Sequence, residues 1–318
     1  MLRRRATGAA RGAGGVAIAT SRASPVFGLS PAVVMTPLLA LVPLVALGCT
    51  RADHARDPGE SKSDENSMNN DIASDLDVAR AARVFFNHQS VGFNLLEGVQ
   101  RLSADAGREL TIVALDQAGT ATRAAGPGWW HTTGGHNGDP RSKIDFFVAT
   151  MKKPDFKPDL AFMKFCYVDF NPQTDVAAVF DYYQRALTAL ERERPDVRFA
   201  HVTVPLMEKP SDFKSRLQRV LGRDVWGDTA NIKRAEFNER LARAFSSDPI
   251  FDLARGESTR PDGTRESFEK HGKVYYSLET SYTSDGGHLN DVGQRVLGAE
   301  MVRFVARALK PALGASEH

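Results

Sequence analysis

Cysteine is nearly absent from this chain of 318 residues, which contains only Cys49 and Cys166. If Cys49 is modified, as its surroundings suggest below, one thiol remains and no internal disulfide can form. Cys166 lies inside the apolar run LAFMKFCYVDF. We therefore interpret it as a buried structural thiol rather than a reactive one.

An excess of charge of either sign is also lacking. The 41 Lys and Arg residues nearly balance the 39 Asp and Glu residues, which gives a formal net charge of +2 at pH 7. This balance gives no electrostatic reason to expect a nucleic-acid partner. Internal repeats are not apparent. The content of 42% hydrophobic and 25% charged residues is ordinary for a globular protein, so a sizeable core can form.

The first 49 residues differ from the rest of the chain. A basic start, MLRRR, precedes a nearly apolar run that ends in ALGC at Cys49. This order is typical of an export signal, and its ending resembles a bacterial lipoprotein signal, in which the cysteine is lipidated. A plain transmembrane anchor is the alternative, because the run is nearly long enough to cross a bilayer. A lipid on Cys49 would hold an exported protein at a membrane of the cell envelope.

The remainder divides into a polar tether and one domain. Residues 50–77 are polar, poor in aromatic residues and without apolar periodicity, which predicts a disordered tether. Over residues 78–312, short apolar stretches alternate with helical patterns. This alternation predicts an α/β domain with a mainly parallel sheet and helices on both faces. Ligands of such sheets bind beyond the carboxyl ends of the strands, so the loops that follow strands are the places to search.

Five strands are expected, at 83–87, 109–116, within 158–169, 197–207 and 249–254. A helix with Asn231 as its cap follows the fourth strand, and the last helix begins after Asn290. The segment 208–229 is longer than a simple connection needs. It either lies across the mouth of the site or forms a surface excursion.

Ser90 stands directly between the first expected strand and the helix that follows it. A hydroxyl there would lie at the carboxyl edge of the sheet, beside helix N–H groups that favour developing negative charge. The alternative is that Ser90 only caps the helix, a role that serine fills well.

A second polar stretch, TSDGGHLNDVGQ, precedes the last helix. Asp285 and His288 are three residues apart in a glycine-containing turn, so the carboxylate can fold back towards the imidazole. An aspartate bonded to one ring nitrogen fixes the tautomer and leaves the other nitrogen free to accept a serine proton. A turn with an incidental surface histidine is the alternative. The chain order Ser, Asp, His is one known arrangement of a hydrolytic triad.

Together, the two stretches resemble the SGNH (GDSL-like) hydrolase family. That family has an early strand–Ser–helix block and a late Asp-x-x-His block that leads into the final helix, and DGGHLNDVG matches the late block. The resemblance covers about residues 83–309. It implies a flavodoxin-like three-layer sandwich, with Ser90 as nucleophile, His288 as base and Asp285 as the residue that orients the base. It implies no cofactor.

Two blocks depart from the family pattern. The chain has His88-Gln89-Ser90 where the family usually has Gly-Asp-Ser, and CYVDFN where it usually has Gly-x-Asn-Asp. Asp169 aligns with the last position of the second block, but Val168 stands at the asparagine position. By the same resemblance, the loop GGHNGDP supplies oxyanion groups through Asn137 or Gly138. Loss of one such donor costs about 3 kcal/mol of transition-state stabilisation.

Trp129 and Trp130 precede that loop and are expected in a loop of their own. They would either stack on a sugar ring or cover the core. His88, His131, His136 and Asp139 can be arranged around a metal on paper, but their spacing fits no zinc signature, so no metal is expected.

The sequence thus predicts an exported, monomeric, lipid-anchored serine esterase. The envelope location and the tryptophan pair favour O-acylated carbohydrate as the substrate class, and acyl transfer to another sugar is a close variant. A non-catalytic carbohydrate-binding or envelope-interaction protein on the same scaffold is the alternative, because the Gly-Asp-Ser and Asn-Asp groups are missing.

Overall fold

The computed structural model describes residues 71–115 and 126–310. Within them, six strands form one parallel sheet in the order β2-β3-β1-β4-β5-β6, and two more form an antiparallel pair. The strands are β1 (Arg83–Asn87), β2 (Ile112–Ala114), β3 (Gly128–Thr132), β4 (Leu160–Met163), β5 (Arg198–Val202), β6 (Ile250–Phe251), β7 (Ser267–Lys270) and β8 (Lys273–Tyr276). The helices are α2 (Val91–Asp105), α3 (Pro140–Met151), α4 (Val176–Glu193), α5 (Phe213–Val220), α6 (Trp226–Ala244), α7 (Leu253–Ser258) and α8 (Asp291–Leu309), with 3-10 turns η2 (Tyr167–Asp169) and η3 (Thr280–Tyr282).

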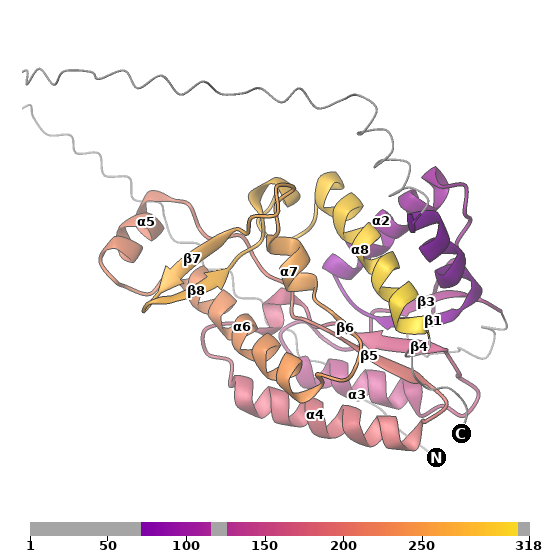
Figure 1. Cartoon of the computed structure of the whole chain (residues 1–318). Helices are drawn as coiled ribbons and strands as arrows, with labels where there is room; N and C mark the ends of the chain where they lie inside the picture. The colour runs from indigo at the N-terminus through magenta and orange to yellow at the C-terminus, as the bar shows by residue number, and fades with distance from the viewer. Residues whose placement is uncertain (1–70, 116–125, 311–318) are drawn as a thin grey trace, which may run out of the picture. The chain divides into compact units, whose positions relative to one another are not determined.

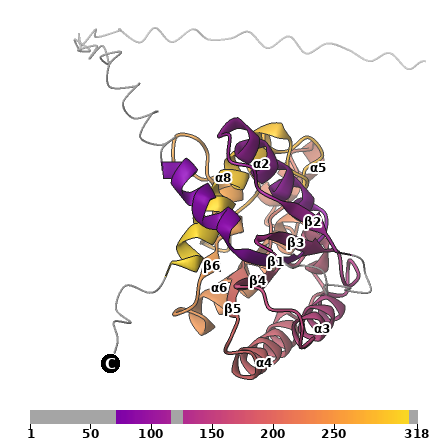
Figure 2. The same cartoon turned by 90° about the vertical axis from the view of Figure 1, so that its right-hand side faces the viewer.

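Helices cover both faces of the parallel sheet. Figures 1 and 2 show α2 and α8 on one face and α3 and α4 on the other. Alternate residues of β1 feed the two cores: Val84 and Phe86 pack with α2 and α8, whereas Phe85 packs with α3, α4 and α6. Because both faces are covered at the centre of the sheet, β4 is apolar throughout and β1 is apolar between its two end residues. The predicted α/β class with a three-layer, mainly parallel architecture is confirmed.

The strand β3 was not expected. Trp129 and Trp130 lie in it, buried between β1 and β2, where a loop was predicted. Trp129 faces one core and donates its indole N–H to the carbonyl of Ala79, and Trp130 faces the other core. The two rings therefore fill the interior. Their assignment to the substrate-binding groups is wrong, because neither offers an exposed face to a sugar.

The domain begins earlier than residue 78. Residues 71–81 form a helix, and its apolar stripe of Ile72, Leu76 and Ala79 is buried in the core beside α8. The predicted end of the tether at residue 77 falls inside this helix. The residues around this stripe are polar, so the stretch resembles a tether. Three apolar residues spaced four and three apart are nevertheless enough to form one buried helix face.

Other N-terminal predictions lie outside the described residues. These are the export signal at 1–49, the lipidated Cys49 and the tether over 50–70. No helix among residues 71–115 and 126–310 has the length and hydropathy that crossing a membrane requires.

The segment 208–229 contains α5 and the start of α6. Asn231 does not cap α6, which begins at Trp226. The Asn231 side chain is buried instead, and it bonds to both the N–H and the carbonyl of Met207. The end of α5 is tied to the β7–β8 pair, because Lys270 donates to the carbonyls of Gly222 and Arg223.

The helices α2 and α8 lie side by side in both views of the fold (Figures 1 and 2). A Cβ added at Gly98 would lie 1.9 Å from the carbonyl oxygen of Gln294, and one at Gly298 would lie 2.6 Å from the carbonyl carbon of Gly98. Near their starts, Asn94 accepts a hydrogen bond of 3.2 Å from the N–H of Leu289. The two helices therefore begin at the same edge of the sheet.

Candidate active site

The structure brings Ser90, His288 and Asp285 together at the starts of α2 and α8. The Ser90 Oγ lies 2.5 Å from His288 Nε2, across a separation of 198 residues in the sequence. His288 Nδ1 lies 2.6 Å from Asp285 Oδ2. Both distances are in the range of hydrogen bonds. The side chains form the continuous hydroxyl–imidazole–carboxylate chain that the sequence predicted.

The backbone at Ser90 is strained. Its φ of 52° and ψ of −111° lie in a region that residues other than glycine rarely adopt. Its side chain makes no capping hydrogen bond to α2, so the capping alternative does not describe it. Strain of this kind costs about 1–3 kcal/mol and is concentrated at functional sites. A sharp turn between strand and helix is also how hydrolases expose a nucleophilic serine.

Asp285 holds the imidazole in place. Its Oδ1 accepts hydrogen bonds from the backbone N–H groups of Gly287 (3.0 Å) and His288 (2.8 Å), and its Oδ2 faces the ring. Burial raises the pKa of Asp285, but the hydrogen bonds from His288 and Gly287 outweigh it and hold the pKa below its ordinary value. The carboxylate is therefore ionised at neutral pH. It favours the tautomer with the proton on Nδ1, which leaves Nε2 free to accept one.

Tyr167 belongs to the same group, although the sequence analysis did not include it. Its hydroxyl lies 3.5 Å from His288 Nε2, the nitrogen that also faces Ser90 Oγ. The ring packs against Gly287, where an added Cβ would lie 2.8 Å from it. Burial raises the pKa of Tyr167, so its hydroxyl stays protonated at neutral pH. The sequence contained one hint of this role. Tyr167 directly precedes Val168, and Val168 stands where the family has asparagine.

A buried guanidinium fixes the backbone at Tyr167. Arg234 on α6 is fully buried and donates to the carbonyl of Tyr167 from both Nε (3.1 Å) and Nη2 (2.8 Å). Nη2 also reaches the carbonyl of Phe170 at 3.3 Å. These hydrogen bonds from α6 therefore fix the turn that carries Tyr167.

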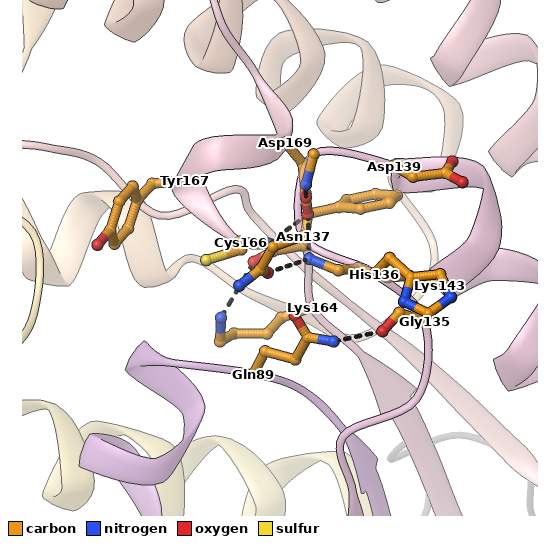
Figure 3. A network of polar contacts seen from close by, with 12 residues as sticks. Gln89, Gly135, His136, Asn137, Asp139, Lys143, Lys164, Cys166, Tyr167 and Asp169 are labelled. Carbon is orange, nitrogen blue, oxygen red and sulfur yellow. Dashed lines mark hydrogen bonds and ion pairs between the residues drawn. The ribbon is translucent and has the colours of Figure 1, made fainter. Parts of the chain in front are cut away.

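Asp169 supports this turn rather than facing a substrate. Its carboxylate is buried and accepts hydrogen bonds from the N–H of Cys166 (2.7 Å), the N–H of Gly138 (2.8 Å) and Lys143 Nζ (2.5 Å) (Figure 3). The assignment of Asp169 to the substrate-binding groups is wrong for this reason. The assignment of Gly138 to the oxyanion groups is wrong as well. Its N–H already donates to Asp169 and is not available to an oxyanion.

Asn137 remains exposed on the same loop. Its Oδ1 accepts a hydrogen bond of 3.0 Å from Lys143 Nζ, which fixes the orientation of the amide. The loop is tied to the residue before Ser90, because Gln89 Nε2 donates to the carbonyl of Gly135 at 2.6 Å (Figure 3) and to that of Thr133 at 3.2 Å. The His88-Gln89-Ser90 block thus uses its middle residue to position this loop.

His88 directly follows β1 and His131 lies near the end of the neighbouring strand β3, and their rings are joined by a hydrogen bond of 3.0 Å. Burial, followed by the charges of His131 and Lys164, holds the pKa of His88 well below its usual range. Among the described residues these rings do not join His136 and Asp139 in a group of close ligand atoms. Asp139 instead caps α3 by accepting from the N–H of Ser142.

No family model matches this chain, and none of the curated proteins matches it either. Among solved structures, the periplasmic domain of a lipopolysaccharide acetyltransferase from Salmonella Paratyphi A is 10% identical over 78% of this chain and 97% of that one, with a TM-score of 0.39. A protein from Parabacteroides merdae, provisionally described as a GDSL-like lipase, is 9% identical over 73% and 97%, with a TM-score of 0.43. A peptidoglycan O-acetylesterase is 10% identical over 58% and 48%, with a TM-score of 0.37.

The printed names of these neighbours are those of acyl hydrolases and acyltransferases. They include the GDSL-like class that the two sequence blocks resemble. Because the identities are near 10% and the TM-scores are below 0.5, the chemistry of this chain is inferred below from its own side chains.

Proposed function

We propose that the chain is a serine hydrolase that cleaves ester bonds. The observation that carries the proposal is the hydrogen-bond chain from Ser90 Oγ through the His288 ring to the Asp285 carboxylate. The strained backbone at Ser90 adds weight to it, because capping does not require this conformation. An ionised carboxylate, a free imidazole nitrogen and an adjacent hydroxyl are the parts that nucleophilic ester hydrolysis needs.

The reaction follows from this geometry. His288 Nε2 takes the proton of Ser90 as Oγ attacks the ester carbonyl, and Asp285 stabilises the resulting imidazolium. The tetrahedral intermediate collapses, the alcohol leaves with the proton from His288, and an acyl-enzyme remains. His288 then deprotonates a water molecule, which attacks the acyl group. The acid is released and Ser90 recovers its proton.

Three donors are proposed for the oxyanion. The backbone N–H of Ser90 lies at the reacting centre, Asn137 presents an oriented amide on the adjoining loop, and Tyr167 offers a protonated hydroxyl. Tyr167 would replace the asparagine donor of the family, since Val168 has no polar group. Removal of one donor typically lowers kcat by about 10²–10³-fold.

The substrate class rests on the exposure of the site. The side chains of His288 and Asp285 are 45% and 57% exposed, so an acyl group carried on a large molecule can reach Ser90. This exposure favours O-acylated carbohydrate, with transfer of the acyl group to another sugar as a variant. The tryptophan pair no longer supports this choice. Export, lipidation of Cys49 and location in the cell envelope remain proposals that rest on the N-terminal sequence.

A fluorophosphonate probe and a panel of acetyl esters and acetylated glycans test the proposal. We expect covalent labelling of the wild type, none in Ser90→Ala and strongly reduced labelling in His288→Ala. Tyr167→Phe should lower kcat about 10²–10³-fold. Tyr182→Phe is the matched control, because that hydroxyl bonds to Asp145 on the helical surface. A folded wild type that neither reacts nor hydrolyses any ester would favour the non-catalytic carbohydrate-binding alternative.

A further inference from the structure

A second cluster of ionisable groups lies at β5. His201 is on this strand, Glu191 is in the last turn of α4, and Asp248 lies in the loop between α6 and β6. His201 Nε2 lies 3.7 Å from a Glu191 oxygen and 3.9 Å from an Asp248 oxygen. All three potential ligand atoms lie within 4.8 Å of one another.

The His201 ring is buried with one nitrogen unused. Its exposed fraction is 0%, and Nε2 has no hydrogen-bond partner within residues 71–115 and 126–310. Nδ1 bonds to the Tyr183 hydroxyl at 2.8 Å, and Phe245 packs on the ring with centroids 3.9 Å apart. The ring is therefore fixed with Nε2 directed at the two carboxylates. A buried, unpartnered nitrogen requires an explanation, since buried polar atoms are nearly always satisfied.

The charges favour a cation at this point. Two carboxylates face the same buried nitrogen, Nε2 of His201. A divalent cation placed between them would neutralise both.

We propose that Glu191, His201 and Asp248 bind a divalent transition-metal ion of the zinc type. One imidazole and two carboxylates are ligands that zinc accepts, whereas Ca²⁺ and Mg²⁺ prefer oxygen alone. Bonds of about 2.0–2.1 Å in a tetrahedron place ligand atoms about 3.3 Å apart. The two distances from His201 Nε2 would therefore shorten by about half an ångström, and the distance between the two carboxylates by at most about 1.5 Å. The two carboxylate side chains are only partly buried and can move this far.

Tyr183 completes the arrangement. With the proton of His201 on Nδ1 directed to the Tyr183 oxygen, Nε2 presents its lone pair, which is the role that outer hydrogen bonds play at zinc sites. The remaining coordination position would hold water. The ion would join the end of α4, the strand β5 and the loop before β6. Glu191 and Asp248 come before the strands β5 and β6, whereas Ser90 comes after β1. The proposed metal site is therefore separate from the site of the proposed ester chemistry.

Zinc binding to the full chain without an affinity tag, stripped of metal, tests the proposal by isothermal titration. We expect one site per chain in the wild type and at least a tenfold loss of affinity in Glu191→Gln and in Asp248→Asn. Glu193→Gln is the matched control, because Glu193 lies in the same turn of α4 and pairs with Lys152 at the surface. Zinc should raise the melting temperature of the wild type and of Glu193→Gln, but not of Glu191→Gln.

Three outcomes would overturn the proposal. The wild type could bind no zinc, or both carboxylate variants could bind it like the wild type. The latter result would place any bound ion elsewhere, for instance at Asp285 and His288. Preferential binding of Ca²⁺ over Zn²⁺ would overturn the assignment to a transition metal. The absorption spectrum of the Co²⁺-loaded protein reports the coordination directly and does not depend on esterase activity.

Discussion

Ser90 holds a backbone conformation that suits glycine better than serine. The Oγ is aimed at His288 as a result, rather than at the free N–H groups of α2. The surrounding contacts maintain this conformation: Gly92 and Phe93 donate to the carbonyls of Gln89 and Ser90. The conformation that directs the Ser90 hydroxyl towards His288 therefore lowers the stability of the fold.

Replacing Ser90 by glycine should stabilise the fold relative to replacing it by alanine. Glycine relieves strain of about 1–3 kcal/mol, offset by about 0.4–1 kcal/mol from the greater freedom of the unfolded chain. We expect Ser90→Gly to exceed Ser90→Ala by about 1–2 kcal/mol in the free energy of unfolding in urea. Both variants should lack esterase activity. An alanine variant as stable as the glycine variant would show that the conformation carries no strain.

At the scale of single residues, short-range patterns were predictable and long-range support was not. Asp285 and His288 lie in one turn, and Ser90 follows a strand, so local spacing revealed them. The role of Tyr167 depends on β4 lying beside β1 and on Arg234 reaching across from α6. Single-sequence patterns do not encode such contacts. For the same reason, the burial of Asp169 against Lys143 could not be predicted from local patterns.

Contact between α2 and α8 sets the geometry of the hydroxyl and the imidazole. Gly98 and Gly298 let the two backbones approach, and Asn94 joins the start of α2 to the loop that carries His288. The distance between the axes of packed helices is usually about 8–10 Å and depends on the side chains at the contact. Two helices that meet at glycines can pack more closely than this. The positions of Ser90 and His288 therefore follow from a single helix pair.

Gly98→Ala should push these helices apart. The new Cβ would lie 1.9 Å from the backbone oxygen of Gln294, which cannot rotate away as a side chain would. We expect a loss of about 1–3 kcal/mol in stability, measured by urea unfolding, together with a lower kcat on an acetyl ester. Gly126→Ala is the control, because an added Cβ there meets nothing within 4 Å. Unchanged stability and activity in Gly98→Ala would contradict this role for the glycine contact.

At the scale of elements, long periodic segments were predictable and short ones were missed. The helices around Val91–Asp105, Val176–Glu193 and Asp291–Leu309 were expected from their apolar stripes. The strand Gly128–Thr132 was missed because it stands between two glycine-containing stretches, which favour a loop. The β7–β8 pair escaped notice because its strands have four residues each.

The core of the molecule contains an ionisable group, Glu257 on α7, that is fully buried. One of its oxygens accepts from the N–H of Leu206 at 2.6 Å, and the other has no hydrogen-bond partner among the described residues. Burial raises the pKa of Glu257 to about 8, against the opposing effects of Leu206, Lys164 and Arg234. The group is therefore mostly protonated in the folded protein at neutral pH.

Glu257→Gln should flatten the dependence of stability on pH. In the unfolded chain Glu257 ionises near 4.5, whereas in the fold it ionises near 8. The contribution of this raised pKa is fully present below about pH 4.5 and declines as pH rises to about 8, by up to about 1.4 kcal/mol per pH unit. Unfolding free energies measured across this window should fall more steeply for the wild type than for the variant. Parallel curves would show that Glu257 titrates normally.

The architecture of the whole molecule was the most predictable level. Alternation of apolar strands and amphipathic helices fixes an α/β fold, because a parallel strand can be reached only through a crossover. The strand order was not predictable in the same way. The entry of β3 between β2 and β1 depends on the packing of Trp129 and Trp130, one on each face of the sheet.

The packing of α2 against α8 has a consequence for the folding of the chain during synthesis. While the polypeptide is being synthesised, Ser90 emerges long before His288, and it has no imidazole beside it until α8 has docked against α2. A half-made or truncated chain therefore holds an ordinary, inert alcohol. Under the proposed function, Ser90 becomes reactive only when the fold is complete, so labelling of Ser90 would report that an individual molecule has finished folding.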